Sequence, residues 1–283
     1  MSKHASAIKP LLVDERNLSH AWARAFLHVT EHPGKEISPL IISVTGFEDD
    51  GAAIEDERVR GALEKALSVK GKRNIEDVAF TIFPQRLWKM AQGDRAKLFD
   101  MYKNAFPRYQ AMNKSANRRG LYFQRLITQG PDQCQGNQLE WILSQFGGRQ
   151  GVRDSMFQAS IFDPARDHVA DAQLQFPCLQ HVSFQPTEEG LVVNAFYATQ
   201  KLFTKAYGNY LGLAQLGAFM AHEMKKKLIR LNVFVGVEKF DEYPKSDAIF
   251  QPLVEAARAC CVDEFTAVPV SAKEIASVVE TAA

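Results

Sequence analysis

Hydrophobic positions along the chain follow two spacings, one typical of helices and one typical of strands. Trp22, Phe26 and Val29 recur at three- and four-residue intervals, which places them on one face of a helix that Asn17 or Ser19 can cap. The same reasoning predicts further helices over 55–69, 209–225 and 248–261, and strands over 40–44, 121–127, 156–162, 178–184, 191–199 and 228–237. Helices and strands therefore interleave, which indicates an α/β (α+β) protein.

One helical stretch and one strand have additional features. Residues 80–109 have helical spacing, but Pro84 and Pro107 are expected to break the helix. The segment 228–237 is almost wholly apolar, which is typical of a strand in the middle of a sheet.

Composition and charge narrow the class of protein. Of 283 residues, 46% are hydrophobic and 24% charged, which is typical of a soluble globular enzyme, and a single domain over 1–283 is expected. The net charge of +1 gives no indication of nucleic-acid binding. No segment approaches the roughly 18 apolar residues of a membrane span, and the sequence starts without the apolar core of a signal peptide.

The four cysteines match neither a metal-binding pattern nor a disulfide framework. Cys260 and Cys261 are adjacent, and Cys134 and Cys178 are isolated, so the Cys-x-x-Cys spacing of a metal site does not occur. We therefore expect no metal ion and a location in the reducing cytoplasm. A single cysteine is most often a small buried hydrophobic residue, and Cys178 by itself could be one.

Two motifs together resemble the centre of the thymidylate synthase family. They are the run Phe-Pro-Cys at 176–178 and the run Ala-Tyr-Gly-Asn-Tyr-Leu-Gly-Leu at 206–213, which opens a long apolar helix. The resemblance implies that the Cys178 thiolate adds to C6 of a pyrimidine ring, while Asn209 hydrogen-bonds the ring's carbonyl and N3. Addition at C6 turns C5 into an enolate carbon that can attack a one-carbon electrophile. Residues 201–208 correspond to the loop before the helix, and residues 137–143 resemble the family's helix that precedes its arginine pair.

The resemblance also implies a fold and an assembly. The expected fold is a thymidylate synthase-like three-layer arrangement, in which helices pack on a mixed β-sheet, with a core over about 17–262 and a C-terminal tail over 263–283. In this family two subunits pair through a sheet face and lend each other phosphate ligands, so a homodimer is expected. Arg153 or Arg149 would be the lent residue. The tail does not repeat the family's folate-closing sequence.

Further candidate catalytic residues follow from the same resemblance. Tyr122 and Arg125 lie in a run similar to the family segment whose tyrosine assists proton transfer at C5, although a structural tyrosine in a strand is an equal alternative. His181 would project to the same face of its strand as Cys178, either as a base or as a satisfied core histidine.

The family's phosphate and ribose ligands are altered in this chain. An Arg-Ser-x-Asp run is replaced by Ala-Thr-Gln-Lys at 198–201, so Thr199 and Lys201 are the expected substrate contacts. A lysine cannot reproduce the bidentate hydrogen bonds of arginine, and nucleoside 5'-monophosphates are therefore expected to bind weakly. Glu238 stands where the family binds the ribose 3'-hydroxyl. The family's proton-shuttling glutamate has no counterpart in 82–88.

These residues predict a C1 transferase of the thymidylate synthase type. It would add a methyl or hydroxymethyl group to C5 of a pyrimidine nucleotide or nucleoside, with 5,10-methylenetetrahydrofolate as donor. The alternative is a catalytically altered homologue that serves as a nucleotide or nucleic-acid binding protein in a modification pathway. Cys178 and Asn209 favour the enzyme, whereas the lost arginine and glutamate favour the binding protein. A substrate without a 5'-monophosphate is a third alternative.

Overall fold

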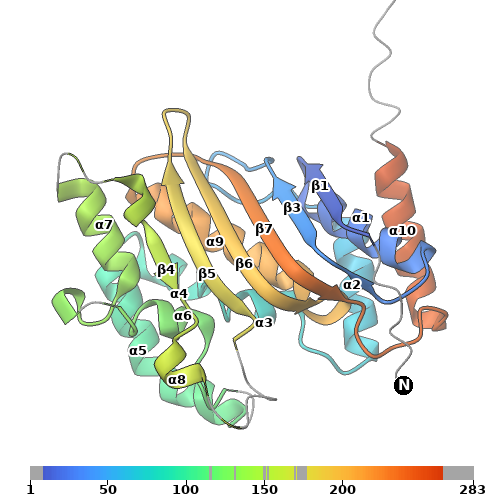
Figure 1. Ribbon diagram of the computed structural model, residues 1–283, viewed down its shortest axis with the longest axis horizontal. Coiled ribbons are helices and arrows are strands. Elements are labelled where there is room, and N and C mark those ends of the chain that lie inside the picture. Colours follow the sequence, from blue (N-terminus) through green and yellow to red (C-terminus); the bar gives the residue numbers. More distant parts are fainter. Residues whose placement is uncertain are drawn as a thin grey trace, which may run out of the picture.

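A seven-stranded mixed sheet runs through the molecule (Figure 1). The computed structural model describes residues 9–114, 117–130, 132–148, 151, 153–168, 170 and 177–263. The strand order is β1-β3-β7-β6-β5-β4, and β2 pairs with β7. β1 runs parallel to β3 and β6 parallel to β7, whereas the other neighbours are antiparallel. The strands are β1 (Leu11–Glu15), β2 (Glu36–Ile37), β3 (Leu40–Val44), β4 (Gln158–Ser160), β5 (Leu179–Pro186), β6 (Leu191–Lys201) and β7 (Leu228–Lys239).

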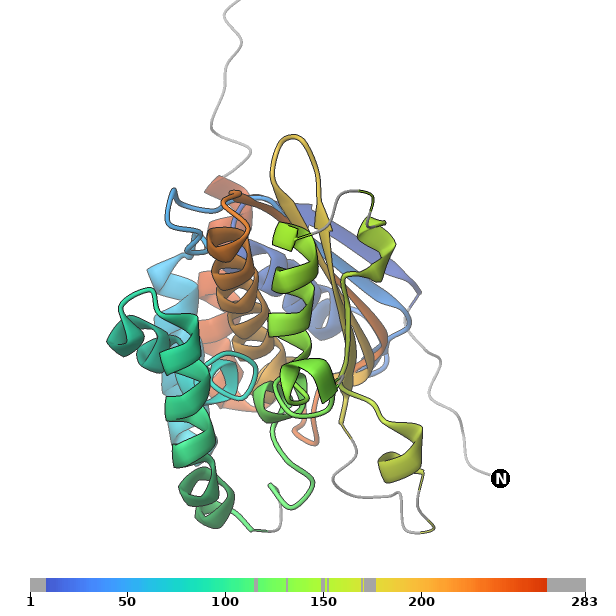
Figure 2. The same ribbon diagram turned by 90° about the vertical axis from the view of Figure 1, so that its left-hand side faces the viewer.

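Helices pack against one face of this sheet. Figure 2 shows α5, α7 and α9 together on one side of it. The helices are α1 (Leu18–Glu31), α2 (Glu57–Val69), α3 (Ile75–Ala79), α4 (Gln85–Ala91), α5 (Arg95–Met112), α6 (Tyr122–Leu126), α7 (Gln138–Gly148), α8 (Pro164–Asp167), α9 (Tyr207–Glu223) and α10 (Gln251–Asp263). The chain therefore adopts a mixed α/β fold in which helices pack on a mixed sheet.

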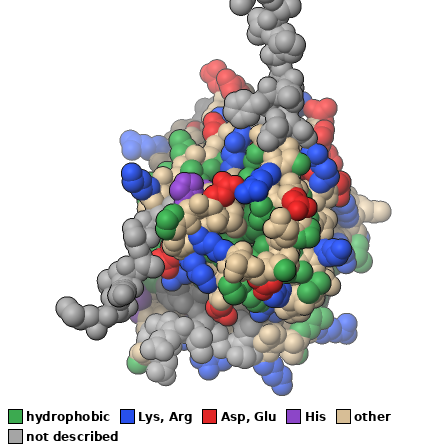
Figure 3. Space-filling view, turned by 90° about the vertical axis from the view of Figure 1, so that its right-hand side faces the viewer, with side chains coloured by type: hydrophobic (Ala, Val, Ile, Leu, Met, Phe, Trp, Pro, Cys, Tyr) green, Lys and Arg blue, Asp and Glu red, His purple; other side chains and the backbone are tan. Residues whose placement is uncertain are grey.

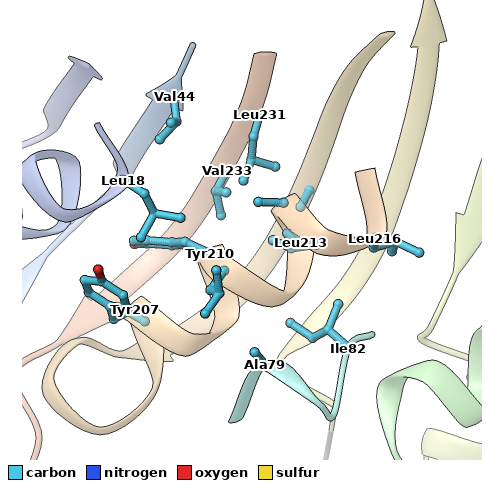
Figure 4. Close-up of a cluster of buried hydrophobic side chains, with 14 of the residues drawn as sticks. Leu18, Val44, Ala79, Ile82, Tyr207, Tyr210, Leu213, Leu216, Leu231 and Val233 are labelled. Atoms are coloured by element: carbon cyan, nitrogen blue, oxygen red, sulfur yellow. The ribbon is translucent and has the colours of Figure 1, made fainter. Parts of the chain in front are cut away.

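Helix α9 lies at the centre of the core (Figure 4). Most of its side chains from Tyr207 to Ala221 are buried, as expected for a helix that is packed on all sides. Tyr210 and Leu213 of α9 cluster with Leu231 and Val233 of β7 in the close-up view.

Two glycines of α9 allow α3 to approach it closely. A Cβ atom at Gly208 would lie 2.6 Å from the Cβ of Val78, and one at Gly212 would lie 2.7 Å from the carbonyl oxygen of Ala79. Both separations are shorter than van der Waals contact, so a larger residue would push the helices apart. The close contact holds the first turn of α9, which contains Asn209, beside α3.

The sheet face opposite the helices carries a stacked pair of aromatic rings. Phe196 and Phe234 are 37% and 38% exposed, and their ring centroids are 5.4 Å apart. Ile41 is the cross-strand neighbour of Phe234, and Leu12 is the neighbour of Ile41. An apolar row therefore crosses β6, β7, β3 and β1 on this face.

Charges of both signs are mixed on the surface at the β1 end of the molecule (Figure 3). The mixture agrees with the net charge of +1 and gives no single-sign field over the described residues of this face. None of the helices in the described part of the chain combines the length and the apolar character needed to cross a membrane.

Several predicted elements are confirmed. The Asn17 side chain caps α1 by accepting hydrogen bonds from the backbone N–H groups of Ser19 and His20, at 2.8 and 3.2 Å. The predicted strands at 40–44, 191–199 and 228–237 are β3, β6 and β7, and the predicted helices at 55–69, 137–143, 209–225 and 248–261 are α2, α7, α9 and α10.

Residues 121–127 do not form the predicted strand. They form α6, because the backbone N–H of Phe123 bonds the carbonyl of Thr81 at 2.9 Å and the Phe123 ring packs edge-on against Phe83 and Tyr102. Tertiary packing around Phe123 thus overrides the β propensity of an aromatic run.

The predicted loop over 201–208 is also wrong. Residues Leu202–Ala206 form a π-helical turn that continues directly into α9. The Asp241 carboxylate accepts bonds from the N–H groups of Phe203 and Thr204, at 2.9 and 3.2 Å, and from the Thr204 hydroxyl at 2.6 Å. These bonds satisfy donors that a loop would leave to solvent.

Two further boundaries differ from the prediction. Pro107 lies on the exposed side of α5, which continues to Met112. The strand expected over 156–162 is shortened to β4, because a turn at Asp154–Met156 precedes it. The sequence reasoning also missed β1 and α3.

Candidate active site

A cavity of about 690 Å³ opens where β6 and β7 end and α9 begins. Its walls come from α3, the end of α5, α6, the start of β5 and the first turn of α9. Cavities of this size suit small-molecule ligands. Six of the nine predicted site residues line it: Tyr122, Arg125, Cys178, Thr199, Lys201 and Asn209. Segments that are far apart in the sequence therefore converge on one space.

Cys178 lies at the cavity wall directly before β5. Its carbonyl oxygen accepts a bond from the backbone N–H of Ala198 at 3.1 Å, which fixes the nucleophile candidate against β6. Burial raises the pKa of the Cys178 thiol, the charges of Lys201 and Lys205 lower it, and Glu238 raises it. Burial prevails, so the thiol is protonated at neutral pH without a ligand.

Tyr122 stands next to this thiol at the start of α6. Burial and then Cys178 raise the pKa of its phenol, while hydrogen bonds from the backbone N–H groups of Leu179 and Cys178 oppose the shift. The phenol is therefore neutral and can donate a proton or a hydrogen bond.

Asn209 brings a carboxamide to the opposite side of the cavity. It is the third residue of α9 and only 4% exposed, and its position is fixed by the π-helical turn before it and by α3 beside it. A carboxamide has a carbonyl oxygen that accepts hydrogen bonds and an NH2 group that donates two. This combination matches the amide edge of a pyrimidine.

The mouth of the cavity is basic. Arg73, Lys201, Lys205 and Lys239 all line it, and no carboxylate does among the described residues. Lys201 pairs with the exposed Glu242 at 2.8 Å. A negatively charged ligand group is the complement of this wall.

Arg125 lines the cavity but is bound to a buried acid. Its two Nη atoms lie 2.6 and 2.9 Å from the Asp167 carboxylate, and it also donates to the carbonyls of Arg119 and Ile161 at 3.1 and 2.8 Å. Four of the five guanidinium N–H groups are thus used within the protein. In this structure Arg125 joins α6 to α8 and the end of β4.

Three predicted site residues lie away from the cavity. His181 pairs across the sheet with Phe196, on the face opposite the helices, and its ring bonds the Gln158 side chain. An irregularity between Leu179 and His181 changes the face to which this part of β5 points. Arg153 is exposed before the turn at Asp154–Met156. Phe176 and Arg149 are outside the described residues.

Glu238, the third of them, is completely buried behind the cavity wall. It pairs in register with Gln200 of β6, and neither the Glu238 carboxylate nor the Gln200 carboxamide has a hydrogen-bond partner among the described residues. The hydroxyls of Tyr197 and Tyr210 likewise have no hydrogen-bond partner among the described residues, and burial raises the pKa of both. Four buried polar side chains without hydrogen-bond partners among the described residues therefore lie on β6, β7 and α9 in this part of the molecule.

Sequence reasoning missed Arg73, Gln200 and Lys239. Gln200 escaped because strict alternation puts it on the face opposite its neighbours Thr199 and Lys201. Both β6 and β7 lose alternation at this end, where a Cβ at Gly236 would lie 2.8 Å from the carbonyl oxygen of Ala198. Runs of basic residues before α3 were the only available signal for Arg73.

No protein-family model matches the chain, and a search of curated proteins finds no match either. The resemblance to thymidylate synthases therefore stays a prediction from the quoted motifs.

Proposed function

We propose that this protein is a thymidylate synthase-like C1 transferase with the corresponding three-layer fold, acting on C5 of a pyrimidine nucleotide or nucleoside. The observation that carries the proposal is the convergence of Cys178, Tyr122 and Asn209 on one cavity. These side chains come from three separate elements, and each has the chemistry that the sequence motifs imply.

In this proposal the Cys178 sulfur forms a bond to C6, and the electrons of the C5–C6 double bond move toward the C4 carbonyl oxygen. Asn209 holds the amide edge of the ring. Lys201 and Lys205 stabilise the thiolate that must form first, because their charges lower the pKa of Cys178. A base must then take the C5 proton as the C5–C6 double bond re-forms and the sulfur leaves as a thiolate. Tyr122, a neutral phenol beside the sulfur, would donate a hydrogen bond that positions a water molecule as this base.

The donor we propose is 5,10-methylenetetrahydrofolate, which supplies the one-carbon unit when bound. Arg73 and Lys239 of the cavity lining would hold its carboxylates. None of the four cysteines, all of which lie in the described residues, is in a disulfide, which supports the reducing cytoplasm that we propose as its location.

A covalent trap tests this function. A 5-fluoropyrimidine nucleotide cannot release fluorine from C5 as a proton is released, so the adduct with Cys178 and the donor should accumulate and add the corresponding mass. Cys178→Ser should abolish the adduct, whereas the control Cys134→Ser should retain it. A folded wild-type protein that forms no adduct with uridine or cytidine analogues would contradict the enzyme.

The second candidate is a nucleotide-binding protein without turnover. It is favoured by the absence of a carboxylate among the described cavity residues and by the raised pKa of Cys178. This candidate would be supported if a pyrimidine nucleotide binds reversibly, with the same affinity in wild type and Cys178→Ser, and forms no adduct with either protein.

We further propose a homodimer through the sheet face that carries Phe196 and Phe234. An isologous contact would cover the apolar row on this face in both copies at once. Light scattering should give twice the monomer mass for wild type and the monomer mass for Phe196→Glu, with exposed Met112→Glu on α5 as control. A wild-type monomer at micromolar concentration would remove this assembly.

A further inference from the structure

The two adjacent cysteines near the end of α10 form a pair of thiols in a contact between helices. α10 packs against α1 and α2 (Figure 1). Cys260 is 0% exposed and belongs to the core, whereas its neighbour Cys261 is half-buried. Their sulfur atoms are 3.9 Å apart. Neither residue lines the candidate active site, so the pair is independent of the proposed one-carbon chemistry.

The two thiols have different roles in this contact. The Cys260 thiol can donate its hydrogen to the Ala257 carbonyl, 3.1 Å away, or to the Cys261 sulfur. The contact between the two sulfurs lowers the pKa of the Cys261 thiol and raises that of the Cys260 thiol. Cys261 is therefore the sulfur that ionises first, and Cys260 stays protonated beside it.

Positive side chains of α1 lie near Cys261. His20 and Arg24 are one turn apart on this helix, and their charges favour the Cys261 thiolate, whereas burial and Glu15 oppose it. Glu15 pairs with Arg24, and the Asp56 carboxylate lies 3.7 Å from the His20 ring. A partly exposed cysteine beside cations and a second thiol is typical of cysteines that react with oxidants.

We propose that Cys260 and Cys261 form an oxidation site, at which hydrogen peroxide converts the two thiols to a reversible disulfide. The Cys261 thiolate attacks one peroxide oxygen, so that an S–O bond forms, the O–O bond breaks, and the departing hydroxide takes up a proton. The Cys260 sulfur then attacks the Cys261 sulfur. The S–S bond forms, the S–O bond breaks, and the hydroxyl group leaves as water with the proton of the Cys260 thiol. The two thiols supply the two electrons that reduce the peroxide.

This disulfide is incompatible with the helix that carries it. Neighbouring Cα atoms are about 3.8 Å apart, whereas Cα atoms joined through a disulfide are usually about 4.4 to 6.8 Å apart. The sulfurs also have to approach from 3.9 Å to about 2.0 Å, which draws Cys260 out of its place in the core. Oxidation therefore unwinds the last turn of α10. A strained disulfide is easily reduced again, as expected of a transient disulfide in a reducing compartment.

Peptide mapping of the full chain after peroxide treatment tests the proposal. One tryptic peptide, residues 259–273, contains both cysteines. In wild type this peptide should lose the mass of two hydrogen atoms, and a dithiol reductant should reverse the loss. In Cys260→Ser a sulfenic acid should remain at Cys261 and react with dimedone, whereas Cys261→Ser should leave Cys260 unmodified. Cys134→Ser is the control and should form the disulfide as wild type does.

Two further measurements test the surroundings of the pair. Hydrogen exchange of the amides in the last turn of α10 should be faster in the oxidised than in the reduced protein. Arg24→Met should slow disulfide formation about threefold or more, because loss of this cation lowers the thiolate fraction of Cys261. Lys65→Met, at an exposed lysine of α2, should keep the wild-type rate.

Two results would overturn the oxidation site: wild-type disulfides that join Cys134 or Cys178 in place of the adjacent pair, or oxidation of Cys178 before the peptide 259–273 changes. If Cys260→Ser does not fold, the mass of the wild-type peptide and its reversal by the reductant decide. A disulfide that leaves hydrogen exchange unchanged would overturn the unwinding of α10. Absence of a pyrimidine adduct at Cys178 would reject the C1 transferase and leave the oxidation site standing.

Discussion

Asp167 and Glu238 are two buried carboxylates near the same cavity, and their surroundings are opposite. Asp167 is 1% exposed, meets the guanidinium of Arg125 at 2.6 and 2.9 Å, and accepts the backbone N–H of Asp163 at 2.9 Å. Glu238 is 0% exposed, and neither of its oxygens has a hydrogen-bond partner in the described residues.

The charge of each acid follows from these surroundings. Burial opposes ionisation of Asp167, but its hydrogen bonds to Arg125 outweigh burial and hold its pKa below the usual value. Burial, with Asp241 in addition, raises the pKa of Glu238 well above its usual value. Asp167 is therefore an anion and Glu238 a neutral acid at neutral pH.

The Asp167 carboxylate stabilises the fold, whereas the Glu238 carboxyl group is buried without stabilising partners. The Arg125–Asp167 pair has nearly all its bonds within the protein, so its role is to hold α6 against α8. Glu238 retains unused donor and acceptor capacity beside Cys178 and Gln200, and such perturbed groups concentrate at functional sites. Equal burial thus does not imply equal function.

Removing one partner of the satisfied pair should give the largest effect. Arg125→Met leaves Asp167 as an unpaired buried charge, and we expect a loss of about 3 to 5 kcal/mol in the free energy of unfolding, measured by urea denaturation. Arg153→Met, at an exposed arginine, should change it by less than about 0.5 kcal/mol.

The double variant Arg125→Met/Asp167→Leu sharpens this test. Replacing both charges by apolar groups should recover most of the loss, because the penalty comes from the uncompensated charge. A loss below about 1 kcal/mol in Arg125→Met alone would show that the pair is not what holds α6 in place.

The sequence predicts a structural element well where residues close to it in the chain determine its conformation, and poorly where distant residues do. Local patterns were sufficient for α1 with its Asn17 cap, for β3 and for the apolar strand β7. They failed at α6, whose conformation depends on packing around Phe123, and at 202–206, which Asp241 holds from a position 35 or more residues later in the chain.

The candidate site shows the same limit. Cys178, Tyr122 and Asn209, which the motifs single out, all line one cavity. Arg125 was expected to bind substrate, and only the structure places it on Asp167, a residue 42 positions away. Glu238 was expected at the substrate, but the loss of alternation at the end of β7 buries it.

The smaller effect concerns the unsatisfied acid and is visible mainly as a function of pH. A raised native pKa means that Glu238 keeps its proton where the unfolded chain loses it, so its contribution to stability is complete below the usual glutamate pKa and is lost as pH rises toward the native pKa. Asp167 has the opposite sign, since its contribution is lost as pH falls below the usual aspartate range.

Glu238→Gln keeps the shape of the side chain without its titration. Urea denaturation from pH 5 to pH 9 should therefore show the free energy of unfolding of the variant increasing relative to that of wild type as pH rises, by up to about 1 to 3 kcal/mol. The exposed Glu242→Gln should follow wild type in this range. If the wild-type and Glu238→Gln curves run parallel, Glu238 is ionised in the folded protein and the contrast with Asp167 does not exist.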